Sequence, residues 1–172
     1  MSLEELAAYV STQLEKFNIP VVLVGGACVS IYSNNQYQTS DLDFVEQYHA
    51  QRSRLKEALE RIGFLEKDRY FVHPDAKYFL EFPVGPLAVG DEPVKELNYR
   101  QTSTGTLRLL TSTDCIKDRL AAYYHWQDKQ ALQQALWVAK NHSFDMDNVR
   151  KWSVQEGMNE KFSDFEAALI PG

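Results

Sequence analysis

Two aspartates separated by one residue carry the clearest chemical signal in this 172-residue sequence. Asp41 and Asp43 flank Leu42 in a segment that alternates polar and apolar residues, the period of a half-buried strand. Side chains two residues apart on a strand point the same way, so both carboxylates should lie on one face. Like charges side by side repel unless a cation lies between them. Magnesium prefers hard oxygen ligands and is usually held by one or two carboxylates with substrate phosphates, so the spacing predicts a magnesium site.

A pair of glycines precedes these aspartates. Gly25 and Gly26 follow the apolar run 21–24, which is typical of a buried strand, and precede the short helical pattern 27–32. Glycines at a strand-to-helix turn let the backbone approach a phosphate, and a helix N-terminus offers free N–H groups. Either motif alone is more often structural, but their order favours a site where phosphate and metal meet. The other common phosphate-binding and hydrolase motifs are absent from the sequence.

The remaining pattern predicts the elements that must position these groups. We expect helices near 3–14 and 50–62, later strands near 70–72, 78–82, 87–89 and 106–110, and helices near 113–125, 128–140, 145–156 and 159–169. The three tryptophans, Trp126, Trp137 and Trp152, are expected to anchor the packing of the last helices. The predicted fold class is α/β (α+β), with a small mixed-sheet lobe at residues 1–110 and a helical lobe at residues 111–172. Both belong to one compact domain, with a ligand where the lobes meet.

Composition narrows the function classes. A net charge of −6 argues against a protein that grips nucleic acid by its overall field, so any RNA or DNA contact must be local. No apolar run approaches the roughly 18 residues of a membrane span, and the N-terminus is acidic where a secretory signal is basic, so we expect a cytoplasmic protein without membrane contact. The two cysteines are expected to be buried and reduced, and the four histidines match no metal-ligand spacing.

The Gly-Gly turn, short helix and Asp-x-Asp strand together resemble the nucleotidyltransferase superfamily related to DNA polymerase beta, and within it the bacterial AbiEii-type proteins. The resemblance implies a third carboxylate on a later strand. We assign it to Glu81, a lone charge in the apolar strand 78–82, where burial is costly unless a cation or partner receives it. The alternative for Glu81 is an exposed position on an edge strand. Asp75 and Asp91 are the other candidates, although both read as turn residues.

The resemblance extends less specifically into the helical lobe. It implies nucleotide-binding roles for Lys117, which would neutralise triphosphate oxygens, and for Asp128, which would orient the lysine or the acceptor. An ordinary solvated helix face with salt bridges explains both residues equally well, and Asp114, Asp118 and Arg119 are compatible with either interpretation. Many relatives carry an arginine a few residues before the Asp-x-Asp motif, whereas this chain has Gln-Tyr-Gln at residues 36–38.

These expectations describe an enzyme that uses two magnesium ions, about 3.5–4 Å apart, to move an NMP from an NTP to an acceptor hydroxyl. The metal ligands and catalytic residues would be Asp41, Asp43 and Glu81. The acceptor would be RNA such as tRNA, a protein or a small molecule. The alternative is a non-catalytic nucleotide-binding module, such as an antitoxin or regulator with a toxin–antitoxin partner, and a third is a toxin that adds nucleotides to tRNA. The third carboxylate discriminates enzyme from module.

Overall fold

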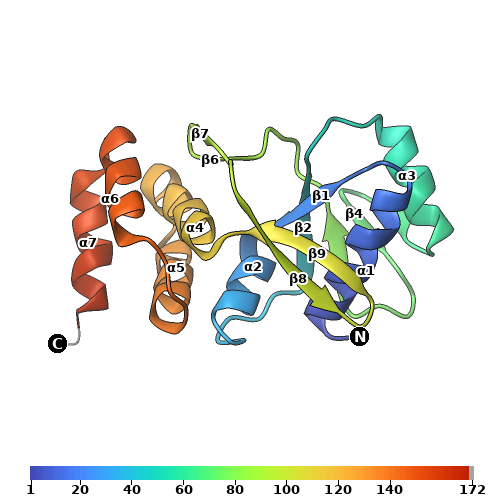
Figure 1. Cartoon of the computed structure of the whole chain (residues 1–172), viewed down its shortest axis with the longest axis horizontal. Helices are drawn as coiled ribbons and strands as arrows, with labels where there is room; N and C mark the ends of the chain where they lie inside the picture. The colour runs from blue at the N-terminus through green and yellow to red at the C-terminus, as the bar shows by residue number, and fades with distance from the viewer. Residues whose placement is uncertain (171–172) are drawn as a thin grey trace.

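A mixed β-sheet forms the centre of the structure, a computed structural model that describes residues 1–170 (Figure 1). Its strands are β1 (Val21–Val24), β2 (Asp41–Glu46), β3 (Leu65–Lys67), β4 (Tyr70–Val72), β5 (Phe79–Glu81), β8 (Leu97–Thr102) and β9 (Gly105–Leu110). They are hydrogen-bonded in the order β3-β4-β5-β2-β1-β9-β8. The pairs β1–β9 and β2–β5 are parallel, and the other neighbouring pairs are antiparallel. A separate hairpin joins β6 (Ala88–Val89) to β7 (Glu92–Pro93).

Among the described residues, one helix precedes the strands, two lie between them and four follow them. The first three are α1 (Leu3–Lys16), α2 (Gly25–Tyr32) and α3 (Arg52–Arg61), and the last four are α4 (Ser112–Trp126), α5 (Lys129–Asn141), α6 (Met146–Gln155) and α7 (Asn159–Leu169). Figure 1 shows α4 to α7 as a lobe at one end of the molecule, with α2 between this lobe and the strands. The change from strands to helices occurs between Leu110 and Ser112.

One face of the sheet has a buried apolar centre. Leu42 pairs with Leu80, and Leu80 pairs with Phe71, so these three side chains share a face, and each is 0% exposed. Helix α3 covers this face beside β4, where the Arg52 guanidinium lies 4.9 Å from the centroid of the Phe71 ring. Helix α1 packs against β1, β8 and β9. The side chains of the opposite face of β2, β4 and β5 are those that carry the candidate chemistry.

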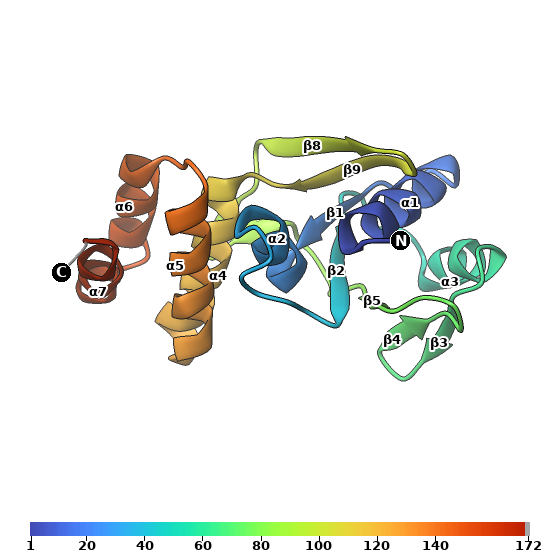
Figure 2. The same cartoon turned by 90° about the horizontal axis from the view of Figure 1, so that it is seen from below.

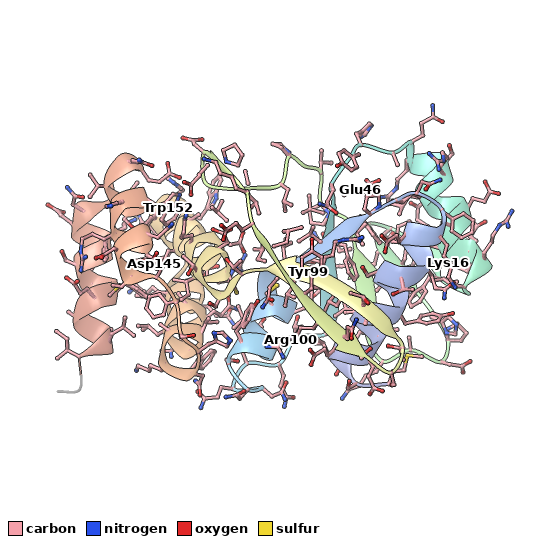
Figure 3. All side chains as sticks on the ribbon, viewed as in Figure 1. Lys16, Glu46, Tyr99, Arg100, Asp145 and Trp152 are labelled. Carbon is pink, nitrogen blue, oxygen red and sulfur yellow. The ribbon has the colours of Figure 1, made fainter. Side chains whose placement is uncertain are left out.

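Side-chain caps fix where the helices of the second lobe begin. Thr111, Asp128 and Asp145 each accept a hydrogen bond from a backbone N–H of the first turn of α4, α5 and α6, at 3.1 Å in all three cases. The β6–β7 hairpin contacts this lobe through a hydrogen bond: the Trp152 Nε1–H donates to the Val89 carbonyl at 3.2 Å (Figure 3).

The predicted fold class is confirmed: a mixed sheet is followed by helices, and each of the four last helices agrees with its predicted bounds within two residues. Three strands, β3, β7 and β8, were not predicted. Trp126 is not a packing anchor, because it is the last residue of α4, where the chain turns away through Gln127 (φ 53°), and it is 82% exposed. None of the helices in residues 1–170 combines the length and apolar character needed to cross a membrane.

Candidate active site

Strand register brings the three candidate carboxylates together. Asp43 on β2 pairs with Val24 of β1 on one side and with Glu81 of β5 on the other. Asp41 precedes Asp43 by two residues, so all three acids project from the same face of the sheet. One carboxylate oxygen from each of the three residues lies within 4.8 Å of the others. We refer to Asp41, Asp43 and Glu81 as the acidic triad.

The glycine turn lies directly against this triad. Gly25 has a φ of 64°, a left-handed conformation that L residues with a Cβ rarely adopt, and a Cβ built on it would lie 2.7 Å from Asp43 Oδ2. The glycine therefore provides the space that the Asp43 carboxylate occupies. Gly26 is also close-packed, because a Cβ there would lie 3.0 Å from the Tyr37 ring. Helix α2 begins at Gly25, and its N-cap residue Val24 makes no side-chain cap, so this helix end has N–H groups to offer to an anion.

Asp43 is in an unusual electrostatic state. Burial, together with the negative charges of Asp41 and Glu81, raises its pKa to about 7, and the positive charge of Arg119 opposes this rise. Its Oδ1 is buried and has no hydrogen-bond partner within residues 1–170. Asp41 is held differently, since the Thr39 hydroxyl donates to Asp41 Oδ1 at 2.9 Å. A buried carboxylate that lacks a partner is costly, and a divalent cation among three carboxylates would remove that cost.

Two arginines flank the triad. Arg69, in the turn between β3 and β4, places its Nε 3.6 Å from Glu81 Oε1, and its side chain is 72% exposed. Arg119, on α4, is ion-paired with Asp118 at 2.6 Å and donates to Gln134 of α5 at 3.3 Å. The triad therefore lies between a cation of the helical lobe and a cation of the β3–β4 hairpin. Figure 2 shows this arrangement of elements, with β2 and β5 between α2 and the hairpin.

The two residues assigned to the nucleotide by resemblance have other contacts. Lys117 is 2% exposed, and its ammonium donates to Glu92 of β7 and to Asn148 of α6 and lies 3.5 Å from Asp114. Residues 117 and 119 are two positions apart on α4 and point to different sides of the helix, so Lys117 faces away from the direction that Arg119 takes. Asp128 caps α5 by accepting from Ala131 N. Nucleotide binding by either residue stays a prediction.

The other carboxylates considered for the third position lie elsewhere. Asp75 follows β4 in a turn, where its N–H donates to His73 Nδ1, and Asp91 lies in the β6–β7 turn, where its N–H donates to Glu156. Glu81 is the residue that joins the two aspartates. Sequence reasoning gave Arg69 no role, because its place beside Glu81 depends on the pairing of β4 with β5, which no local pattern encodes.

The arrangement can hold a divalent cation and present it to an anion. Three carboxylates converge, one of them has an unsatisfied buried oxygen, and the start of a helix lies beside them. These residues therefore fit magnesium by the chemistry of their donor set.

The sequence matches no protein-family profile, and no curated protein resembles it significantly. Solved structures do resemble it. An antigenic nucleotidyltransferase-like protein from Paracoccidioides brasiliensis aligns with a TM-score of 0.63 and 15% identity over 97% of this chain and 91% of that one. The solution structure of the antibiotic-resistance factor ANT(2'')-Ia aligns with a TM-score of 0.53 and 16% identity over 97% and 94% of the two chains. Its crystal structure in complex with adenylyl-2''-tobramycin gives 0.52 and 13% over 94% and 95%. The chain therefore has the nucleotidyltransferase fold.

Proposed function

We propose that this protein is a magnesium-dependent nucleotidyltransferase, which moves an NMP from an NTP to the hydroxyl group of an acceptor. The observation that carries the proposal is the acidic triad beside Gly25, with the buried and unpartnered Oδ1 of Asp43 at its centre. The fold supports it, because similar structures are nucleotidyltransferase-like and one contains an adenylylated product.

Magnesium held by Asp41, Asp43 and Glu81 would neutralise phosphate charge and lower the pKa of the acceptor hydroxyl. The N–H groups at the start of α2 bind oxygens of the triphosphate. Glu81 accepts the proton of the acceptor hydroxyl. At the same time the hydroxyl oxygen forms a bond to the α-phosphorus, and the bond from the α-phosphorus to pyrophosphate breaks. Arg119 supplies positive charge from the helical lobe as negative charge moves onto the departing pyrophosphate. Lys117 and Asp128 are the nucleotide contacts implied by resemblance.

The presence of a third acid favours an enzyme over a binding module. Holding a nucleotide needs one metal ion with the triphosphate, which two carboxylates can supply, whereas transfer also needs an activated hydroxyl. Glu81 lies in register with Asp43, where a group that activates the hydroxyl is required. The acceptor classes that fit the fold are RNA such as tRNA, a protein, and a small molecule such as the aminoglycoside named for the ANT(2'')-Ia complex. A toxin–antitoxin role belongs to the same proposal through the AbiEii resemblance.

Calorimetric titration of an NTP with and without magnesium tests the proposal, followed by incubation with labelled NTPs and a panel of acceptors. Affinity should require magnesium and fall at least tenfold in Asp41→Asn and Asp43→Asn, about 1.4 kcal/mol, because each removes a metal ligand. Glu81→Gln should keep most of the nucleotide affinity and abolish labelling. Affinity that is equal in wild type and both asparagine variants would refute the metal site. Binding without labelling of any acceptor would favour the module.

A further inference from the structure

The face of the sheet that carries the acidic triad continues into a pair of aromatic rings, of which Phe79 is exposed and Tyr70 is half-buried. Tyr70 is the register partner of Glu81, and Phe79 is two residues before Glu81 on β5, so both rings lie on the triad's face. Their centroids are 5.9 Å apart, and Phe79 is 43% exposed although its neighbour Leu80 is fully buried. A large ring left open on the reactive face offers a planar surface to a ligand.

A cation completes this surface. The Arg69 guanidinium lies 4.8 Å from the centroid of the Tyr70 ring, and its Nε lies 3.6 Å from Glu81 Oε1. Arg69 projects from the two-residue turn of the β3–β4 hairpin, and Lys67, the register partner of Tyr70, adds a second positive charge. The Arg69 Nη2 also donates to the Tyr70 hydroxyl at 2.5 Å, which holds the guanidinium beside the rings. Magnesium at the triad would compete for Glu81 and leave the rest of the exposed guanidinium for an anion of the ligand.

The order of elements across the sheet separates this surface from the phosphate turn. Gly25 follows β1 on one side of the triad, whereas Arg69, in the β3–β4 turn, and Tyr70 and Phe79, on β4 and β5, lie on the other side. If the triphosphate lies at the start of α2, the acceptor must approach from the opposite side, next to Glu81. This assignment rests on the proposed function.

We propose that Arg69, Tyr70 and Phe79 form the acceptor subsite, and that it takes the end of a single-stranded nucleic acid. A base stacks on the aromatic pair, and the adjacent phosphate pairs with Arg69. Exposed rings interleaved with cations are how proteins hold single strands, because every base has a stacking face and every linkage carries a charge. A polycationic small molecule would instead be repelled by the positive charges of Arg69 and Lys67. The net charge of −6 agrees with contact confined to one small surface.

Fluorescence anisotropy with a short, labelled single-stranded oligoribonucleotide tests this proposal, in the presence and absence of magnesium and a non-hydrolysable NTP. Phe79→Leu keeps apolar bulk but removes the ring, so it should weaken binding roughly five- to hundredfold. Arg69→Gln should weaken binding and reduce the slope of log affinity against log salt by about 0.7, the value for one single-strand phosphate. The NTP affinity of both variants should equal that of the wild type.

Matched controls are available on other surfaces. Arg61 is 63% exposed, pairs with a glutamate and lies 5.4 Å from an aromatic ring centroid, as Arg69 does, but it belongs to α3 on the other face of the sheet. Tyr99 is 59% exposed on β8, the far edge strand (Figure 3). Arg61→Gln and Tyr99→Leu should bind the oligonucleotide as the wild type does.

The possible outcomes separate the subsite from the proposed function. The subsite is overturned if the wild type does not bind the oligonucleotide, if the Arg69 and Phe79 variants bind it equally well, or if the controls lose as much affinity. A loss of NTP affinity in Arg69→Gln with unchanged oligonucleotide binding would assign the arginine to the triphosphate and also overturn it. If the wild type binds no NTP, but the Arg69 and Phe79 variants bind the oligonucleotide more weakly than the wild type as expected, the nucleic-acid surface stands and the transferase proposal fails.

Discussion

At the scale of single residues, the ionisation of Asp43 links the acidic triad to the stability of the fold. Its pKa in the folded protein, about 7, is above the ordinary value of 3.8. The folded state therefore binds this proton more tightly than the unfolded chain does, and the resulting stability is fully present below pH 3.8 and is lost as the pH rises through 7. In the absence of metal, the protein carries an electrostatic cost at neutral pH, which a bound cation would remove.

The pH dependence of unfolding checks this inference. In chelator, Asp43→Asn should match the wild type near pH 4 and exceed its free energy of unfolding near pH 8 by on the order of 1–3 kcal/mol, because the amide cannot ionise. Urea unfolding across this range measures the difference, and saturating magnesium should restore the wild type alone. Asp75→Asn, at an exposed turn position outside the triad, serves as the control. A difference between wild type and Asp43→Asn that stays constant from pH 4 to pH 8 would contradict the raised pKa.

Gly25 matters for two reasons: it adopts a left-handed backbone conformation, and its missing Cβ leaves room for the Asp43 carboxylate. A second glycine in the chain serves as a control that separates the steric effect from the backbone effect. Gly25 and Gly157 have φ values of 64° and 74°, but a Cβ on Gly157 meets nothing within 4 Å. Both alanine variants should lose about 1 kcal/mol of stability from the left-handed backbone. Gly25→Ala should also displace the Asp43 carboxylate and weaken magnesium binding at least tenfold, measured by titration calorimetry. Equal magnesium affinity in the two variants would show that the carboxylate tolerates the methyl group.

At the scale of elements, the strand β2 and the helices were predictable because their residues repeat with a clear period. Asp41 to Val45 alternates polar and apolar residues, and the amphipathic helices repeat theirs every three to four positions. In the seven-stranded sheet, strands β3 and β8 were not predicted. All three residues of β3 are exposed, and β8 is an edge strand with no fully buried residue. Neither segment therefore has the alternation of apolar and polar residues that indicates a strand. Tertiary pairing alone makes them strands.

Helix α4 is tied to its neighbours by the buried Lys117. Its ammonium contacts Glu92, Asp114 and Asn148, and burial raises the pKa of Asp114 despite the attraction of the lysine. Lys117→Met should cost about 3–5 kcal/mol of stability, because it leaves two carboxylates without their cation. Thermal unfolding measures this cost, and adding Asp114→Asn should recover part of it. A variant as stable as the wild type would show that the cluster contributes nothing to the fold. The NTP affinity of Lys117→Met, measured well below the melting temperature of this variant, tests separately the predicted contact between Lys117 and phosphate.

At the scale of the whole molecule, the site combines two parts of the chain that a local pattern cannot place together. Gly25, Asp41 and Asp43 lie close in sequence, and their spacing was enough to predict that the two carboxylates share a face beside the glycine turn. Arg69 and Arg119 reach the triad through the pairing of β4 with β5 and through the packing of α4, which depend on long-range contacts. The triad carboxylates come from the sheet lobe and Arg119 comes from the helical lobe, so a nucleotide bound at the triad and contacted by Arg119 would link the two lobes.

Ligand binding should therefore stabilise both lobes together. At a ligand concentration one hundred times Kd, magnesium and a non-hydrolysable NTP add about 2.7 kcal/mol, which corresponds to a rise in Tm of roughly 5–10 °C for a chain of this size. The three tryptophans, Trp126, Trp137 and Trp152, all lie in the helical lobe, so their fluorescence reports its melting, whereas circular dichroism reports the whole chain.

Both signals should shift by the same amount in the wild type, and neither should shift in the double variant Asp41→Asn, Asp43→Asn, whose substitutions lie in the sheet lobe. A shift of the tryptophan signal that depends on these two aspartates requires that the sheet lobe and the helical lobe melt as one unit around the ligand. If the ligand raised the midpoint seen by circular dichroism and left the tryptophan midpoint unchanged, the nucleotide would contact the sheet lobe alone, and Arg119 would have no part in holding it.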